Sequence, residues 1–387
     1  MDITAPLTGP VGLAARLAPS IRAVSDEIED LYDLPSTLVA ALREAGAFSL
    51  LTPRELGGFE APLTTALQVY EEFGRLDASV AWVVWNANFG FMGALLGDAG
   101  IRQIWPADRP GPVFANSGSP GTAVPVDGGY LVSGNWKIVS GVDAADWVVV
   151  IAVISEGAAP RLTEGGQPDV RLFAVPASQV TIKKTWHVSG MRGSGSNDVV
   201  IDDAFVAAEL VGRFDVPPRI DRPLYRGFLP ALVLAGCTAI VVGVAAAAID
   251  DTVRLALTKK SVTGEAMAER PRVQSVIAAS EADLDAARLL LLSAARSLQD
   301  AGEAGVAVTA EQRAALRAAM SHAARVSRRV LVDMYELASS SPLYTGDALE
   351  RRFRDGMAAL QHVNHSAAAF EAAGRVRLGL APNMALF

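Results

Sequence analysis

The chain has 387 residues, enough for two or three domains or for one large composite fold. Hydrophobic residues make up 51% of it and charged residues 20%, which favours a large core and excludes extensive disorder. The net charge of −8 is spread along the chain and argues against nucleic acid as the main partner.

Targeting and redox features favour the cytoplasm. Cys237 is the only cysteine, so neither a disulfide nor a thiolate metal cluster can form within one chain. The N-terminus has neither a basic region nor an apolar run, and we expect no secretory signal. Residues 228–249 carry no charge and are long enough to span a bilayer, but no basic cluster flanks them. Their Ala, Val and Gly content favours a helix buried in a bundle or subunit interface, so we expect no membrane partner.

Residues 10–106 show helical patterning. Pro35 and the serine after it begin one helix, and Gly46 is placed to end it. Pro62 opens the next helix. Residues 77–96 are expected to form a further helix crowded with aromatic side chains. Such a face usually packs into a core, but buried amides need partners, so the asparagines among these residues are candidates to face a pocket.

The hydrophobic period changes to two from about residue 112, which predicts an antiparallel β domain of about 100 residues. Within it, Tyr130–Ser133 and Asn135–Val139 are predicted as two strands joined by a tight turn at Ser133-Gly134. The strand-like runs, separated by Gly, Pro and Asp, are 112–116, 121–126, 130–139, 147–154, 169–176, 179–186, 198–202 and 204–211.

The remaining chain from about residue 223 is helical in pattern. Four long helices are predicted at about 227–258, 271–302, 309–340 and 347–378. Because their joins are short and they are rich in Ala, they are expected to form an antiparallel bundle. The predicted class is therefore mostly α with a central antiparallel β domain. Its expected domains are 1–111, helical; 112–222, β; and 223–387, a four-helix bundle.

One strand end has the features of a ligand site. The strand that contains Trp136 stops at Ser140-Gly141, where a hydroxyl and backbone N–H groups are exposed together. This combination suits an electron-rich, hydrogen-bonding ligand edge, and the indole offers a flat apolar face. A hairpin turn with a packed tryptophan is the alternative interpretation.

Five strings in chain order resemble signatures of the acyl-CoA dehydrogenase superfamily, over nearly the whole chain. The resemblance implies that superfamily's fold: an N-terminal helical domain, a β-barrel-like middle domain and a C-terminal four-helix bundle. The strings are GAFSLLTPRELGG at 46–58, EEFGRLDASVAWVV at 71–84, GGYLVSGNWKIVSG at 128–141, GMRGSGSNDVVIDDAFV at 190–206 and RRFRDGMAALQH at 351–362.

Within that superfamily the chain departs from the dehydrogenases proper. In one major subset of those enzymes the base is a glutamate after the Arg-Asp pair, but here Arg354-Asp355 is followed by no acid before Glu371. The flavin-contacting segment reads FANSGSPGTA at 114–123 and lacks the Glu and Asp of the dehydrogenase pattern. The chain instead resembles the two-component flavin-dependent monooxygenases of the same fold.

That resemblance implies an activity and its partners. Enzymes of this group receive reduced FMN or FADH2 from a separate flavin reductase, bind O2 and form a C4a-hydroperoxyflavin. They then oxygenate a small molecule, here expected to be aromatic or a secondary metabolite. The sequence leans to FMN because no adenosine-binding signature is visible. The alternatives are an FAD-dependent dehydrogenase or desaturase that lacks the usual base, and a non-enzymatic flavin or interaction protein.

The resemblance also implies site residues. His362 stands where the group carries a catalytic histidine, and its ordinary pKa suits a proton carrier. Ser140 is expected to donate to the flavin. Arg272, at the start of a bundle helix, is expected to hold the flavin phosphate. Further flavin contacts are expected from Asn116, Ser117, Trp136 and Trp186, and substrate contacts from Trp85, Asn86, Phe89 and His365.

Two other cofactor classes are not supported by spacing. No Glu lies three residues before any of the four histidines, so a di-iron bundle site is not expected, and we predict no metal. No glycine-rich GxGxxG string follows a strand and opens a helix, so a Rossmann site is not expected. Burial of residues 228–249 by Ala-rich partners favours assembly into a homotetramer.

Overall fold

The computed structural model describes residues 9–157, 159–260, 264–384 and 387. They group into two compact units, each built from separate stretches of chain. The sheet unit comprises Met1–Pro62, Val83–His187 and Arg192–Leu229, and the helical unit comprises Leu63–Trp82, Val188–Met191 and Pro230–Phe387. The fold class expected from the sequence is confirmed, whereas the three-domain division stays a prediction.

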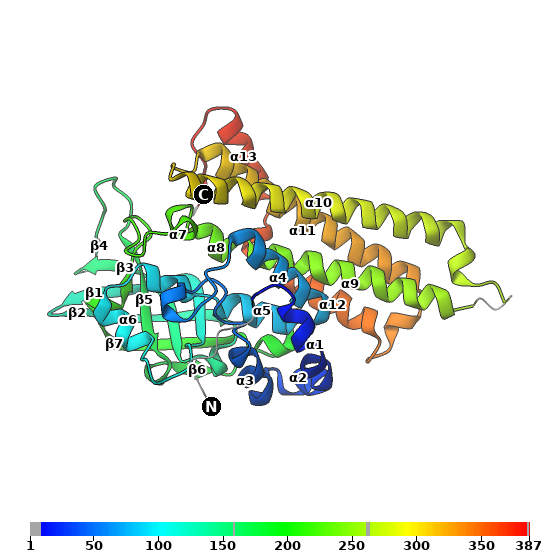
Figure 1. Ribbon diagram of the computed structural model, residues 1–387, viewed down its shortest axis with the longest axis horizontal. Helices are drawn as coiled ribbons and strands as arrows, with labels where there is room; N and C mark the ends of the chain where they lie inside the picture. Colours follow the sequence, from blue (N-terminus) through cyan, green and yellow to red (C-terminus); the bar gives the residue numbers. More distant parts are fainter. Residues whose placement is uncertain (1–8, 158, 261–263, 385–386) are drawn as a thin grey trace. The chain divides into compact units, whose positions relative to one another are not determined.

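The sheet unit is built on one eight-stranded sheet (Figure 1). The strand order is β6-β7-β2-β1-β3-β5-β8, with β4 paired to β3. Most pairs are antiparallel as expected, but β1 and β3 run parallel, because β2 occupies one edge of β1 and β3 returns along the other edge in the direction of β1. The strands are β1 Phe114–Val126, β2 Gly129–Val139, β3 Trp147–Glu156, β4 Ala159–Pro160, β5 Val170–Pro176, β6 Thr181–Lys183, β7 Asn197–Ala207 and β8 Val211–Gly212.

The two strands predicted within residues 130–139 are one continuous strand, β2, so the predicted turn at Ser133-Gly134 is wrong. The pairing of β2 with β7 instead shifts register between Val132 and Gly134, as at a β-bulge. The indole of Trp136 explains the glycine: a Cβ on Gly134 would lie 2.7 Å from the ring, and one on Gly121 of β1 only 2.2 Å from it. The glycines therefore make room for a buried ring.

Short helices complete the sheet unit. The predicted helix between Pro35 and Gly46 is confirmed as α3. The single helix predicted over 77–96 is wrong: α5 ends at Ala87, and a separate turn, η2, follows. Asn88 interrupts it, because its buried amide bonds to the chain at Leu50 and at two carbonyls. The helices are α1 Leu13–Ala23, α2 Ser25–Leu31, α3 Ser36–Glu44, α6 Asp98–Ile104 and α7 Pro223–Arg226. The one-turn segments are η1 Arg54–Leu56, η2 Gly90–Ala94, η3 Val142–Ala144, η4 Ala177–Gln179, η5 Arg192–Ser194 and η6 Ala208–Leu210. Helix α5, Ala78–Ala87, has residues in both units.

The helical unit contains three of the four predicted long helices (Figure 1). Its helix α4 packs on α9, where Gly74 and Gly243 let the two backbones approach closely. The fourth predicted helix, 347–378, is wrong, since the chain breaks into α12, the turn η9 and α13. The elements are α4 Leu63–Leu76, α8 Pro230–Leu234, α9 Gly236–Thr258, η7 Met267–Glu269, α10 Pro271–Ala304, α11 Ala310–Ala338, η8 Ser341–Leu343, α12 Ala348–Ala359, η9 Val363–His365 and α13 Ala368–Arg377.

Local polar contacts account for the break in the fourth helix. His362 and Ser366 both adopt extended backbone angles, and each side chain accepts a bond from the amide two residues on. Between them, the side-chain amide of Asn364 donates from its Nδ2 to the backbone carbonyl of Leu234, which is distant in sequence. Side chains of this kind compete with the helical backbone for hydrogen bonds. The candidate histidines therefore lie on a turn and not on a helix face.

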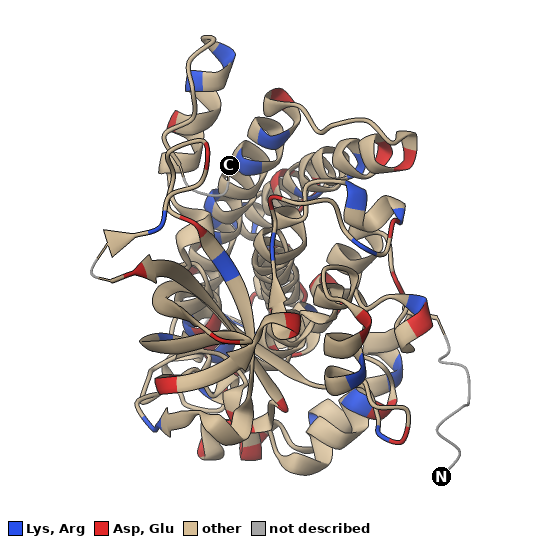
Figure 2. Ribbon diagram, turned by 90° about the vertical axis from the view of Figure 1, so that its left-hand side faces the viewer, with Lys and Arg blue, Asp and Glu red and all other residues tan. Residues whose placement is uncertain are grey.

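The apolar segment at the start of the bundle has the length and hydropathy of a membrane span. In the described chain it covers Pro230–Thr258, and 89% of its most apolar window is buried inside the protein. This burial agrees with the expected core helix. Lys, Arg, Asp and Glu are interspersed along the described helices and strands (Figure 2), as the spread of charge in the sequence suggested.

Candidate functional site

Ser140 lies in a buried chain of hydroxyl groups in the sheet unit. Its Oγ is 2.8 Å from the Oγ of Ser196, which is 2.7 Å from the Oγ of Ser194. All three residues are at most 2% exposed. The N–H of Gly141 donates to the Ser194 carbonyl, so the end of β2 is tied to the segment before β7. Sequence reasoning missed Ser194 and Ser196 as partners of Ser140, although both lie in the family string at 190–206.

Ile138, two residues before Ser140, has an unusual conformation. Its φ is +58°, which is rare for a β-branched residue and costs free energy. Its side chain is 60% exposed although it is large and apolar. Strained and exposed residues concentrate at functional sites. The sequence pointed to Trp136 on the same strand and not to Ile138, because backbone strain is not visible in a sequence.

Trp136 itself is fully buried, and its Nε1 donates to the Ile151 carbonyl at 3.3 Å. With the glycines of β1 and β2 against its face, this is the packing of a core residue. Its contact with a flavin stays a prediction.

Asn116 and Asn86 are brought together. The Nδ2 of Asn116 donates to the backbone carbonyl of Asn86 at 2.8 Å, which joins the start of β1 to the end of α5. Ser117 is 8% exposed, and Phe89 is 5% exposed with its ring centroid 4.7 Å from that of Phe91. Trp85, like Asn86, is 8% exposed. These predicted cofactor and substrate residues therefore lie at the β1–α5 junction or in its buried surroundings.

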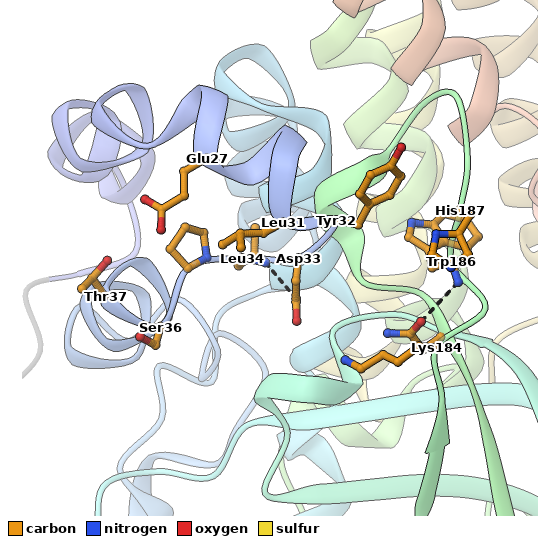
Figure 3. Close-up of a pocket in the computed structure, with 12 residues that line it drawn as sticks. Glu27, Leu31, Tyr32, Asp33, Leu34, Ser36, Thr37, Lys184, Trp186 and His187 are labelled. Carbon is orange, nitrogen blue, oxygen red and sulfur yellow. Dashed lines mark hydrogen bonds between the residues drawn. The ribbon is translucent and has the colours of Figure 1, made fainter.

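Trp186 lies in a different part of the sheet unit. It lines a cavity of about 460 Å³ next to the α2–α3 connection (Figure 3). Its backbone N–H donates to the Oδ1 of Asn197 at 3.2 Å. No other predicted cofactor residue lines this cavity among those that the structure describes.

His362 caps the turn η9 in the helical unit. Its Nδ1 accepts the N–H of Asn364 at 3.2 Å, which makes Nε2 the nitrogen that carries the proton in the neutral ring. The imidazole meets Trp82 edge to face at 5.5 Å between centroids. Burial lowers the pKa of His362 to about 4, so the ring is neutral near pH 7.

His365 lies 6.1 Å from His362 between ring centroids. Burial, and then the neighbouring His362, lower its pKa to about 3. Both ring nitrogens are buried, and neither makes a hydrogen bond of good geometry within the described chain, although the backbone of Ala359 lies close enough to oppose the fall in pKa. Buried polar atoms are rarely left unpaired, so this ring is suited to a bound molecule that supplies a donor or an acceptor.

The Arg354-Asp355 pair of the sequence motif has a positioning role. The carboxylate of Asp355, 2% exposed, accepts the N–H of Met191 at 2.7 Å. Arg354 donates to the Ser189 carbonyl at 2.6 Å. A Cβ on Gly190 would lie 2.2 Å from the Arg354 carbonyl oxygen, so glycine is required between the two contacts. The pair anchors Val188–Met191 to α12.

Arg272 lies in the first turn of α10, after Pro271 at the first helical position. Its side chain is exposed. A guanidinium at this end of a 34-residue helix favours an anion through its own charge and through the helix dipole.

No cluster of three or more metal-ligating side chains occurs among the described residues.

Comparison with known proteins places these features in one family. The family model "Acyl-CoA dehydrogenase, N-terminal domain" matches residues 13–105, and "Acyl-CoA dehydrogenase, C-terminal domain" matches residues 235–367. The chain is 30% identical to an indole-3-acetate monooxygenase of Acinetobacter baumannii, covering 93% of this chain and 92% of the relative. It is 29% identical to the flavin-dependent monooxygenase oxygenase subunit HsaA of Rhodococcus jostii, covering 89% and 92%. It is also 29% identical to the oxygenase component of an FADH(2)-dependent resorcinol hydroxylase of Rhizobium, covering 96% and 94%.

Solved structures of similar proteins share the fold of this chain. The 3-HSA hydroxylase of Rhodococcus superposes with a TM-score of 0.89 at 26% identity, covering 98% of this chain and 99% of that one. XiaF of Streptomyces, solved in complex with FADH2 and glycerol, gives a TM-score of 0.85 at 25% identity, with coverage of 97% of this chain and 98% of that one.

Proposed function

We propose that this chain, which belongs to the acyl-CoA dehydrogenase superfamily and is a flavin-dependent monooxygenase of its two-component branch, oxygenates a small aromatic molecule with O2 and a reduced flavin supplied by a separate reductase. The observation that carries the proposal is the turn after α12. It presents two half-buried, neutral imidazoles, His362 and His365, and the chain from Gly356 to Phe370 contains no carboxylate. One major subset of dehydrogenases of this fold carries its carboxylate base there, and the relatives are named as monooxygenases and hydroxylases, so the monooxygenase is favoured over the dehydrogenase.

The residues present fit a flavin. The ring offers carbonyl oxygens and nitrogens at its edge, and the Ser140–Ser196–Ser194 chain offers hydroxyl donors. The backbone at Ile138 projects an apolar side chain two residues from Ser140. A bound reduced flavin supplies the electrons that activate O2. We assign Ser140 to hydrogen bonding with the flavin, and Asn116 and Ser117 to contacts with the same ring.

We assign His362 to proton transfer. With Nδ1 held by the Asn364 N–H, its Nε2 is the atom that gives or takes a proton. His365 is assigned to the substrate, because its unpartnered nitrogens suit a polar group of a bound molecule. Trp85, Asn86 and Phe89 are assigned to the wall of the substrate pocket.

An aromatic substrate is supported by the relatives, whose names specify indole-3-acetate and resorcinol. The flavin is proposed as reduced FMN or FADH2. One relative is named as FADH(2)-dependent and one similar structure contains FADH2, which supports FADH2 more than the FMN favoured by sequence. The separate reductase is implied by relatives named as oxygenase subunits or components.

We further propose a homotetramer in the cytoplasm. Leu289 and Leu290 on α10 are 64% and 49% exposed, and exposed leucines on a long helix favour burial by another copy. Sedimentation equilibrium tests the assembly: a monomer at micromolar concentration contradicts it.

The central experiment compares activity with and without reduced flavin. The purified chain is expected to be colourless and to consume O2 and an aromatic substrate only when FADH2 or FMNH2 is added. His362→Ala should then remove most product formation while leaving the Kd for reduced flavin largely unchanged. His322→Ala, on α11, is the matched control. A yellow protein that oxidises substrate without O2, or full activity in His362→Ala, contradicts the proposal.

The proposed phosphate contact has its own test. Arg272→Ala should weaken binding of reduced FMN but not of reduced riboflavin, which has the same ring and no phosphate. Equal weakening of both, or of neither, contradicts the assignment.

Trp186 is also tested by reduced-flavin affinity. Trp186→Phe should weaken binding if the indole contacts the ring, and unchanged affinity rejects the predicted contact.

A further inference from the structure

The cavity beside the α2–α3 connection is a pocket with aromatic side chains on one side and acidic side chains on the other (Figure 3). Its volume of about 460 Å³ lies in the range of ordinary small-molecule sites. Both the N-terminal helices and the segment between β6 and β7 contribute side chains. The described lining residues are Glu27, Leu31, Tyr32, Asp33, Leu34, Pro35, Ser36, Thr37, Lys184, Trp186, His187 and Asn197.

One side of the pocket is aromatic. Trp186, His187 and Tyr32 lie next to one another in Figure 3. His187 meets Tyr32 edge to face at 6.0 Å between centroids, and the Arg192 guanidinium lies 5.3 Å from the Tyr32 ring. These contacts hold the wall in place, and a flat wall of this kind favours a planar ligand.

The other side of the pocket is acidic. Asp33 and Glu27 contribute carboxylates, and Lys184 is the one lysine or arginine among the described lining residues. The Lys184 charge is already engaged, since its Nζ lies 2.5 Å from the carboxylate of Asp143. Asn197 also donates to Asp143, at 2.9 Å, so its amide is not available to a ligand.

Since Glu27 is exposed, Asp33 is the more buried of the two lining carboxylates. Its Oδ1 accepts the N–H of Leu34 at 2.8 Å, and no ion pair involves it in the described chain. Burial, reinforced by the charge of Asp143 and a hydrogen bond with it, raises the pKa of Asp33 to about 6, although the Leu34 bond and the charge of Lys184 oppose the shift. It is still mostly ionised at pH 7. A ligand cation beside it would offset the cost of this half-buried charge.

We propose that this pocket binds a planar aromatic compound that carries a protonated nitrogen, with its ring against Trp186 and its cation at Asp33. The volume admits a two-ring compound and exceeds what a single arginine or lysine side chain of a partner would fill. An anionic reduced flavin is disfavoured by the same carboxylates. None of the described lining residues is assigned to proton transfer or to the substrate, so the proposal does not depend on those assignments; it shares only Trp186 with the predicted flavin contacts.

The test uses three naphthalene probes of one shape: 2-naphthylmethylamine, 2-naphthylmethanol and 2-naphthoate. Calorimetry at pH 7.5 on the full chain without flavin should show the amine binding on the order of tenfold more tightly than the alcohol, and the acid more weakly still. Asp33→Asn should make the amine and alcohol equal. Asp26→Asn should keep the preference, because Asp26 is an exposed acid on the neighbouring α2 that does not line the pocket.

Two further variants locate the probe. Trp186→Ala should weaken all three probes, because the ring contact is common to them. His365→Ala should change none of them, which separates this pocket from the proposed substrate site. The proposal is overturned if the alcohol binds as tightly as the amine, or if Asp33→Asn keeps the preference while its circular dichroism and thermal midpoint remain those of the parent.

Discussion

The imidazole of His362 and the indole of Trp82 meet edge to face, with 5.5 Å between ring centroids and 72° between ring planes. Trp82 is only 7% exposed, so this contact takes the imidazole out of water. The neutral ring that results is the form that can both donate and accept a proton.

This burial predicts a dependence of stability on pH. The folded-state pKa of His362, about 4, lies below its ordinary value of 6.5, so below pH 6.5 the unfolded chain binds a proton that the folded chain resists. Above pH 6.5 this group does not change the free energy of unfolding. As the pH drops from 6.5 towards 4, the free energy of unfolding should fall, by at most about 3 kcal/mol for this group. Urea denaturation at a series of pH values measures it.

His362→Asn is the informative variant, because Asn keeps a capping acceptor but does not titrate. Its unfolding free energy should vary less between pH 6.5 and 4.5 than that of the parent. His322→Asn is the control. An unchanged pH slope in His362→Asn would show that the imidazole is not buried as described.

Ser196 is the middle member of the hydroxyl chain, and its loss affects both neighbours. Ser196→Ala leaves the buried hydroxyls of Ser140 and Ser194 each without this partner, which should cost about 1–3 kcal/mol of stability. Ser194→Ala removes a terminal member and should cost less. Denaturant titration gives the ranking, and reduced-flavin affinity should follow it; a larger effect of Ser194→Ala would contradict the chain.

Asp355 is a buried carboxylate that contacts a backbone N–H and two guanidinium groups. Besides the Met191 N–H it lies 3.7 Å from Arg351 and 3.5 Å from Arg354. Asp355→Asn removes the charge that both guanidinium groups face and should cost about 2–4 kcal/mol. The more exposed pair of Glu350 with Arg354 is the control, and Glu350→Gln should cost under about 1 kcal/mol. Equal losses in thermal unfolding would argue against a buried network.

Ile138 offers a test that separates function from stability. Ile138→Asn should raise stability by up to about 1 kcal/mol, because Asn tolerates positive φ and little apolar surface is lost from an exposed side chain. Its affinity for reduced flavin should nevertheless fall, as the apolar contact is lost. Lys137 is exposed and directly precedes Ile138, so Lys137→Asn should leave both the stability and the flavin affinity unchanged. Stronger flavin binding by Ile138→Asn would remove Ile138 from the site.

Features set by neighbouring residues were predictable from the sequence. Pro35 and Gly46 bound α3 as expected, and the side chains of Thr309 and Gln312 cap α11 reciprocally. The position of His362 at the end of the Arg-Asp helix was likewise readable from the motif, and the family and fold that the motifs implied are confirmed.

Features that depend on distant partners were not predictable. The Ser133-Gly134 step predicts a turn, but glycine is required at position 134 because the indole of Trp136 lies against it. The last helix breaks because Asn364 bonds to Leu234, a contact 130 residues away in sequence. Ser196 is a partner of Ser140 only because the fold brings the segment before β7 beside the end of β2, which the sequence does not predict.

The close packing of α4 on α9 has a consequence for biosynthesis. Gly74 contacts Ile240 and Gly243 contacts Glu71, so the apolar face of α4 has no partner until the ribosome has translated well over a hundred further residues. During that interval the nascent polypeptide displays a hydrophobic helix, which is the state that chaperones recognise and that aggregates. Expression yield should therefore respond to translation speed and chaperone supply more than to the final thermodynamic stability.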